Sequence, residues 1–124
     1  TCFITAYDNE GEALKTLTET KDAYGLGDRV DAKPRDLFRD PISFLELNKY
    51  DIAVIDPPRA GAEAQAKQLA KSTIKKIIYV FCDTHTASRD LLLLQTAGYT
   101  IKSLKAIDQF IYSNHIEGVA VLIK

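Results

Sequence analysis

Two patterns of apolar and polar positions alternate along the chain. Short, mostly apolar runs, which predict strands, lie at Phe3–Tyr7, Asp51–Ile55 and Lys76–Phe81, and a further short strand is predicted at Val30–Lys33. The segments that follow them predict helices. One helix ends near Ala23, a short one lies within Phe38–Leu47 with Pro41 near its start, and two span Ala62–Ser72 and Ala87–Ala97. Strands that alternate with helices form a parallel sheet with helices on both faces. We therefore predict an α/β fold with a mostly parallel, doubly wound sheet.

Two further runs lie near the end of the chain. Thr100–Ile107 alternates loosely and Val119–Ile123 is apolar throughout, so we expect an antiparallel hairpin with a long connection. Ile52–Ile55 does not alternate, which is typical of a strand buried on both faces. Because no linker, repeat or low-complexity tract interrupts the pattern, we expect residues 1–124 to form a single domain.

Polar or reactive residues stand where four of these strands end: Asp8, Asp36, Asp56 and Cys82. The carboxyl ends of parallel strands share one edge of a sheet, and ligands of open α/β sheets bind there. We therefore expect these residues to converge on one cleft.

Local roles compete with ligand binding at two of these positions. Asp8, or Asn9 beside it, can cap the helix that follows. A carboxylate at the end of a strand can also accept both hydroxyls of a ribose. Asp36 can simply complete a turn after Pro34.

The turn Asp56-Pro57-Pro58-Arg59 follows the apolar run Ile52–Ile55. Neither proline donates a hydrogen bond and both have a fixed φ, so the turn is rigid and its carbonyl oxygens are left to accept. Such an edge suits a ligand that donates, such as an amine. The alternative is a structural turn with a proline at the first position of the next helix.

Cys82 ends one predicted strand just before a predicted helix. A buried cysteine is usually a small apolar residue, whereas a helix N-terminus stabilises a thiolate and favours a nucleophile. His85 on the intervening loop is either a base partner or solvent-exposed. Glu117, at the start of the last strand, is either solvated or directed into the same cleft as a base.

Composition and charge restrict the class of protein. A net charge of -1 argues against a dedicated nucleic-acid-binding module, although an RNA enzyme can carry its basic surface on another domain. Cys2 and Cys82 form neither a disulfide framework nor a metal motif, which predicts a reducing, cytoplasmic location. The sequence contains no methionine and begins inside an apolar run, so we expect it to be a fragment of a longer protein.

A family resemblance rests on several short motifs in one order. They are Asp56-Pro-Pro-Arg-Ala-Gly-Ala, Tyr79-Val80-Phe81-Cys82, Ala87-Ser88-Arg89-Asp90, Gly98-Tyr99, Asp108-Gln109-Phe110 and His115-Ile116-Glu117. Together they resemble the catalytic domain of the S-adenosylmethionine-dependent RNA uracil-5-methyltransferases. The resemblance implies S-adenosylmethionine as cofactor and ribosomal or transfer RNA as partner.

The resemblance also implies a role for each candidate residue. Cys82 would be the nucleophile that adds to carbon 6 of uracil, and Glu117 the base that removes the proton from carbon 5. Asp8 would bind the cofactor ribose, Asp36 would lie near the adenine, and Asp56 near the cofactor and the target base.

Two departures from the family pattern bear on activity. Phe81-Cys82-Asp83-Thr84 replaces the usual serine-cysteine-asparagine-proline, and a carboxylate beside a thiol should raise the pKa of that thiol. The family's first strand and glycine-rich cofactor loop have no counterpart in this chain. We therefore expect this chain alone to be inactive and to bind the cofactor weakly or not at all. We also expect its sheet to close the resulting gap or to fill it from another chain by self-association.

The sequence leaves two alternatives to this function. The first is a non-catalytic α/β binding module in which Cys82 is merely buried. The second is a methyltransferase that acts on another base or on protein.

Overall fold

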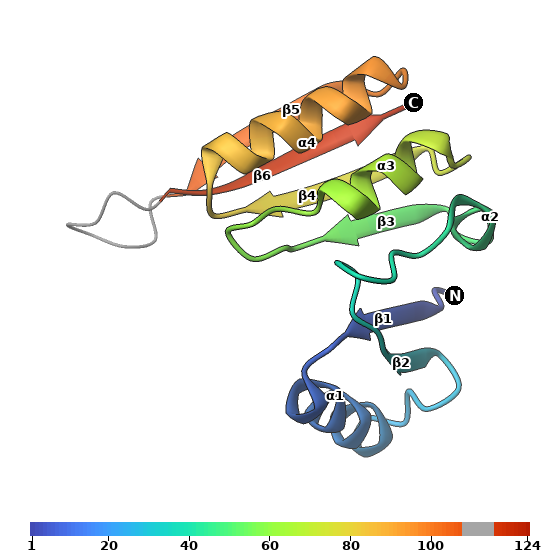
Figure 1. Cartoon of the computed structure of the whole chain (residues 1–124). Coiled ribbons are helices and arrows are strands. Elements are labelled where there is room, and N and C mark those ends of the chain that lie inside the picture. The colour runs from blue at the N-terminus through green and yellow to red at the C-terminus, as the bar shows by residue number, and fades with distance from the viewer. Residues whose placement is uncertain (108–115) are drawn as a thin grey trace. The chain divides into compact units, whose positions relative to one another are not determined.

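A computed structural model describes residues 1–107 and 116–124 of the chain (Figure 1). The chain divides into two compact units, Thr1–Pro41 and Ile42–Lys124. The ranges of the strands and helices follow the apolar pattern closely in both units.

The first unit consists of β1 (Ile4–Asp8), α1 (Gly11–Ala23) and β2 (Val30–Pro34). The two strands pair in parallel, from Ile4 opposite Val30 to Asp8 opposite Pro34. The residue that caps α1 is Glu10, and its side chain makes no capping hydrogen bond. The expectation that Asp8 or Asn9 caps this helix is therefore wrong, because the helix starts one residue further along the chain.

The described residues of the second unit form four strands and three helices. In chain order they are α2 (Phe44–Leu47), β3 (Ile52–Ile55), α3 (Glu63–Lys71), β4 (Lys76–Phe81), α4 (Thr84–Thr96), β5 (Thr100–Ile107) and β6 (Glu117–Ile123). The sheet order is β3-β4-β6-β5. Only β3 and β4 pair in parallel, whereas β4–β6 and β6–β5 are antiparallel. The α/β class and the final hairpin are confirmed, but the sheet of this unit is mixed rather than mostly parallel.

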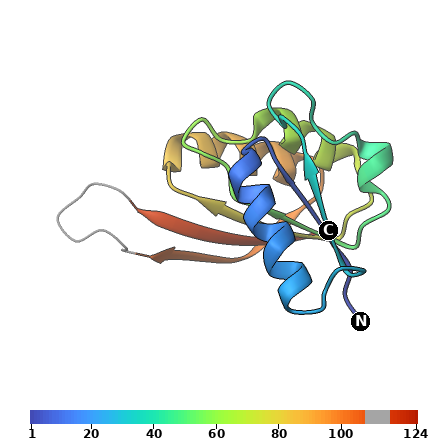
Figure 2. The ribbon, with the colours of Figure 1, turned by 90° about the horizontal axis from the view of Figure 1, so that it is seen from below.

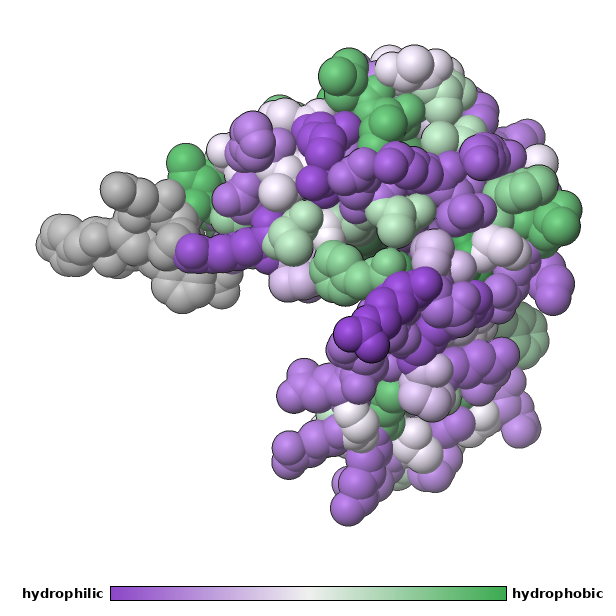
Figure 3. All heavy atoms as spheres, in the orientation of Figure 1, coloured by the Kyte–Doolittle hydropathy of each residue, from purple (hydrophilic) through white to green (hydrophobic). Residues whose placement is uncertain are grey.

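The core of the second unit lies between the sheet and the helices α3 and α4, which lie side by side on one face of the sheet (Figures 1 and 2). The sheet contributes Ile77, Tyr79, Ala120 and Leu122, and all four are fully buried. Leu69 of α3 and Leu94 of α4 pack against them as buried residues. The outer surface of the two helices carries many hydrophilic residues, as Figure 3 shows. The helices are therefore amphipathic and cover this face only.

The other face of this sheet leaves β3 partly exposed, contrary to the expectation that this strand is buried on both faces. Ile52 is 52% exposed and Val54 is 68% exposed, while Ala53 and Ile55 on the helix side are partly buried. Within its own unit β3 is buried on one face and lies at the edge of the sheet. The prediction of burial on both faces is wrong here because α3 and α4 lie on the same side.

Proline and capping chemistry determine where two of the helices begin. The short helix expected within Phe38–Leu47 is α2, whose four residues start after Pro41. A residue before proline avoids the helical region, and the hydroxyl of Ser43 caps the helix by accepting from the backbone N–H of Glu46 at 3.2 Å. In contrast, α4 begins three residues earlier than expected because Asp83 caps it.

Strands β1 and β3 belong to separate sheets. The expectation that the sheet closes the gap by pairing these strands is therefore wrong. Filling of the gap by another chain stays a prediction.

The contact between Phe81 and Gly118 sets the spacing of β4 and β6 at the end of the sheet. These residues are paired across the two strands, and a Cβ atom on Gly118 would lie 2.1 Å from Cζ of the Phe81 ring. We predict that Gly118→Ala lowers the free energy of unfolding by about 1–3 kcal/mol, because the ring must leave its place. Urea unfolding of the chain measures this change.

A double-mutant cycle tests the stated cause. In a Phe81→Leu background the three ring atoms nearest Gly118 are absent, so the added cost of Gly118→Ala should fall clearly below its cost in the natural chain. Equal costs in the two backgrounds would show that the ring is not the obstacle.

Candidate functional site

The ends of β4 and β6 bring Cys82 and Glu117 to the same edge of the sheet. Phe81 pairs with Gly118 in the antiparallel ladder, Cys82 follows Phe81, and Glu117 precedes Gly118. The ladder between β4 and β6 ends with this pair, so Cys82 and Glu117 each stand one residue beyond it at the same edge of the sheet. Both residues are partly exposed, and Cys82 is a free thiol. A thiol and a carboxylate are thus both present at this edge.

Asp83 occupies the start of the helix that follows Cys82. Its Oδ1 accepts from the backbone N–H of Thr86 at 2.9 Å and from the Thr86 hydroxyl at 3.2 Å. The backbone hydrogen bond from Thr86 lowers the pKa of Asp83, so this carboxylate stays ionised. His85 lies in the first turn of α4 and is exposed, so its expected place on a loop is wrong. The N-terminus of α4 therefore already holds an anion beside Cys82.

Asp56 follows β3 and is exposed at the same edge of the sheet. The backbone N–H of Gly61 donates to the carbonyl oxygen of Pro58 at 2.9 Å, which closes a turn. Because α3 begins only at Glu63, with Ala62 as its cap, neither proline lies in the first turn of the helix. The alternative interpretation of these prolines as helix starters is therefore wrong.

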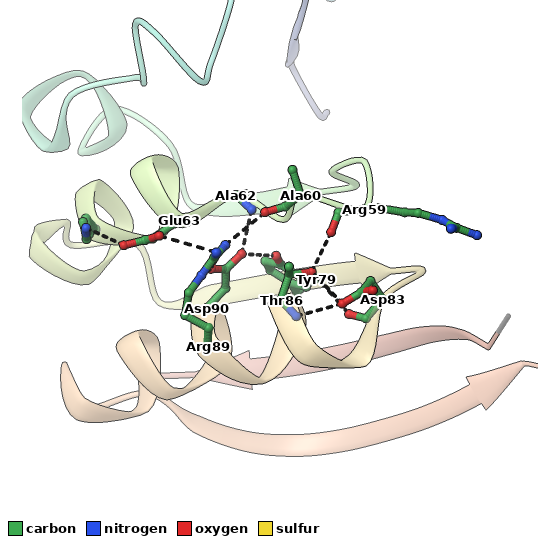
Figure 4. Close-up of polar contacts among 10 residues, drawn as sticks. Arg59, Ala60, Ala62, Glu63, Tyr79, Asp83, Thr86, Arg89 and Asp90 are labelled. Atoms are coloured by element: carbon green, nitrogen blue, oxygen red, sulfur yellow. Dashed lines mark hydrogen bonds and ion pairs between the residues drawn. The ribbon is translucent and has the colours of Figure 1, made fainter. Parts of the chain in front are cut away.

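Side chains from β4 and α4 hold this turn from below, as Figure 4 shows. The Thr86 hydroxyl donates to the carbonyl oxygen of Arg59 at 2.9 Å, and Nη2 of Arg89 donates to that of Ala60 at 3.1 Å. Asp90 is fully buried, and its Oδ2 accepts from the backbone N–H of Ala62 at 2.6 Å. We call Tyr79, Thr86, Arg89 and Asp90 the Asp90 cluster.

The protonation states of the Asp90 cluster favour these contacts. The Tyr79 hydroxyl donates to Oδ2 of Asp90 at 2.5 Å, and burial, followed by this bond, raises the pKa of Tyr79 far above its ordinary value. The hydrogen bond to Asp90 also raises the pKa of Arg89, whose Nε donates to Oδ1 of Asp90 at 2.8 Å. Both residues therefore keep their protons and remain donors to the buried carboxylate.

Arg89 also contacts the first turn of α3. Its Nη1 lies 3.4 Å from Oε2 of Glu63. The pKa of Glu63 is lowered, first by its hydrogen bond with Lys67. Arg89 therefore joins α4 to the first turn of α3 as well as to the turn after Asp56.

The sequence alone suggested no role for the Asp90 cluster, although Arg89-Asp90 belongs to one of the family motifs. The spacing of its polar residues could have indicated a shared helix face. Thr86, Arg89 and Asp90 stand at positions i, i+3 and i+4, which share one face of a helix, in a segment otherwise rich in leucine. Their partners, however, lie 27 to 29 residues away along the chain.

Asp8 and Asp36 lie together in the first unit, where the adjacent strands β1 and β2 end. Oδ1 of Asp8 accepts from the backbone N–H of Glu10 at 2.8 Å, and Asp8 is exposed. Oδ1 of Asp36 accepts from the N–H groups of Phe38 at 3.0 Å and Arg39 at 3.3 Å. The local turn role of Asp36 is therefore present in the structure. Of the four residues expected at strand ends, Asp8 and Asp36 thus belong to the first unit, and Asp56 and Cys82 belong to the second.

Part of the motif pattern falls outside the described residues, namely Asp108-Gln109-Phe110 and His115. Among the residues that the structure does describe, no three acidic, histidine or cysteine side chains are grouped to hold a metal ion. In the same residues, none of the helices has the length and apolar character needed to cross a membrane.

Several known proteins are similar to this chain. An uncharacterized RNA methyltransferase of Agrobacterium fabrum is 47% identical over 122 residues, which are 98% of this chain and 29% of that protein. The 23S rRNA (uracil(1939)-C(5))-methyltransferase of Hahella chejuensis is 40% identical over 78 residues, 63% of this chain and 18% of that protein. The chain thus spans less than a third of the length of these relatives.

A solved structure is similar over nearly the whole chain. The Pyrococcus abyssi tRNA (uracil-54, C5)-methyltransferase, in complex with S-adenosyl-L-homocysteine, matches with a TM-score of 0.82 and 25% sequence identity. The match covers 98% of this chain and 28% of that one. The family model of the tRNA (uracil-5-)-methyltransferases matches residues 30–124. Since that range is well over half of the chain, the chain belongs to the tRNA (uracil-5-)-methyltransferase family.

Proposed function

We propose that this chain forms part of an enzyme that methylates carbon 5 of a uridine in RNA through a covalent cysteine–uracil intermediate. The observation that supports this proposal is the register of β4 and β6, whose last pair, Phe81–Gly118, has Cys82 and Glu117 as its direct neighbours in the sequence at one sheet edge. A nucleophile and a base at one edge are the two groups that this chemistry needs. Family membership supports the same reaction.

The chain's residues act in two steps. The thiolate of Cys82 forms a bond to carbon 6 of the uracil, which makes carbon 5 electron-rich. After carbon 5 has gained its methyl group, the carboxylate of Glu117 removes the proton from carbon 5. The electrons of that C–H bond then re-form the ring double bond, and the Cys82 sulfur leaves from carbon 6.

S-adenosylmethionine supplies the electrophilic methyl group in this proposal, and two carboxylates of the chain fit it. Asp8 is exposed where β1 ends, and a carboxylate there can accept from ribose hydroxyls. Asp56 is exposed in a turn whose two prolines offer no N–H, so its carboxylate suits a donating amine. Asp36 is assigned to the vicinity of the adenine by the family resemblance alone.

We propose ribosomal or transfer RNA as the partner. Relatives of this chain carry names that specify a uridine in 23S rRNA or in tRNA. The chain's net charge of -1 provides little attraction for phosphates. Most of the affinity for RNA would therefore come from regions like those of the longer relatives that this chain does not span.

Covalent trapping tests the nucleophile and the base. In the natural full-length protein that contains this chain, RNA with 5-fluorouracil at the target should form a stable adduct, because fluorine at carbon 5 cannot leave as a proton does. Cys82→Ala should abolish the adduct. Glu117→Gln should accumulate adduct even on ordinary uridine RNA, with turnover reduced by about 100-fold or more. Denaturing gel electrophoresis and methyl transfer assays measure both effects.

Cys2→Ala is the matched control, because Cys2 is the other cysteine of the chain and is exposed in the first unit. It should trap RNA as the natural protein does. An adduct in Cys82→Ala would show that the nucleophile is another group. A Cys82 thiol that resists alkylation in the folded protein would favour a non-catalytic binding module.

Asp83→Asn removes the negative charge beside Cys82, and asparagine can still cap α4.

The same substitution should change stability in acid. The pKa of Asp83 is lowered in the folded chain, so its contribution is present above the unfolded pKa of about 3.9 and is lost as pH falls through the lower folded value. The stability of Asp83→Asn should therefore depend less on pH below about pH 4. Urea unfolding at pH 3 and at pH 6 measures this difference, and an equal pH dependence in both proteins would contradict it.

A further inference from the structure

A fully buried carboxylate stands behind the proposed site. Asp90 has 0% exposure, and its two oxygens accept from Ala62, Tyr79 and Arg89. Burial of a charge is costly unless every lone pair finds a donor. These donors come from the turn after Asp56, from β4 and from α4. The carboxylate therefore joins three segments that are distant in the sequence.

The turn between β3 and α3 depends on side chains of α4 for its backbone contacts. Thr86, Arg89 and Asp90 bind the Arg59 carbonyl, the Ala60 carbonyl and the Ala62 N–H respectively. Pro57 and Pro58 have no N–H and contribute no donor of their own. The path of the turn is consequently determined by one face of α4.

Gly61 shows how closely the turn approaches the cluster. It has φ +76°, and an added Cβ would lie 2.7 Å from Asp90 Oδ2 and 2.7 Å from Arg89 Nη2. The left-handed conformation is strained for other residues. The backbone of the turn therefore lies directly against the buried carboxylate of Asp90.

The same helix face also holds the segment that carries the proposed nucleophile. The Thr86 N–H donates to Asp83, the residue after Cys82, while the Thr86 hydroxyl donates to the Arg59 carbonyl. One residue thus contacts both the Cys82–Asp83 segment and the turn after Asp56. Movement of either segment would break a bond of Thr86.

We propose that the Asp90 cluster is a positioning device that fixes the Asp56 turn relative to Cys82. The proposal rests on the proposed function and extends it to residues that do not touch the reacting atoms. Asp56 and Cys82 leave neighbouring parallel strands. Their loops extend beyond the sheet, where strand pairing no longer holds them. The Asp90 cluster holds these two loops in place relative to each other.

Thr86→Val in the natural full-length protein is the sharpest test, because it removes the hydroxyl contacts to Arg59 and Asp83 but retains the shorter backbone bond from Thr86 to Asp83. We expect kcat for methyl transfer to fall at least tenfold, with KM for RNA changed less than about threefold. Thr86→Ser, which restores a hydroxyl, should recover most of the activity. Asp90→Asn should show the same split at a temperature where it is folded.

Ser88→Ala is the matched control, since Ser88 lies on the same helix and its hydroxyl donates only to the Thr84 carbonyl in the described contacts. It should keep the natural kcat. Hydrogen–deuterium exchange should rise at residues 59–62 in Thr86→Val but not in Ser88→Ala.

The outcomes separate the two proposals. A Thr86→Val protein with natural kcat, or with unchanged exchange at residues 59–62, would overturn the positioning role while the proposed reaction stands. A loss of thermal stability without a change of kcat in folded Asp90→Asn would overturn it as well. Failure of the unsubstituted full-length protein to methylate RNA or to trap 5-fluorouracil RNA would overturn the proposed function, and the positioning role with it.

Discussion

The buried carboxylate of Asp90 is the constraint on which the turn after Asp56 depends. An isolated charge in a protein interior costs several kcal/mol, so Asp90 can be buried only if its donors are in place together. Those donors are Tyr79 in β4, Arg89 in α4 and the backbone of Ala62. The requirement couples packing to polarity, because the bonds from Tyr79 and Ala62 form only when the sheet and the turn are assembled against α4.

The strand register is the second constraint, and it bears on the proposed site more directly. Pairing of Phe81 with Gly118 brings Cys82 and Glu117 to the same sheet edge, although they are 35 positions apart in the sequence. The ring of Phe81 fills the space where any larger residue than glycine would place its Cβ. The aromatic ring of the residue before Cys82 therefore leaves no room for a side chain at position 118.

The charge beside the thiol sets this chain apart from the usual family pattern. Asp83 serves α4 as its cap, and its hydrogen bond with Thr86 keeps it ionised. The family's asparagine could provide the same cap without a charge. Asp83 thus caps the helix and at the same time places a negative charge next to the thiol of Cys82.

Local patterns were enough to predict β4 at Lys76–Phe81, the final hairpin, and Asp56 and Cys82 at strand ends, because strand and helix periodicity and proline chemistry act over a few residues. They did not predict the exposure of Val54, since it depends on which face of the sheet the helices cover. Nor did they predict the partners of Thr86, Arg89 and Asp90. Which backbone groups those side chains bind depends on β3, β4 and α4 packing together, and a hydrogen bond across 28 residues leaves no periodic trace in the sequence. The sequence by itself therefore determined the elements and the residue types at their ends, whereas the tertiary structure decided which of those residues meet.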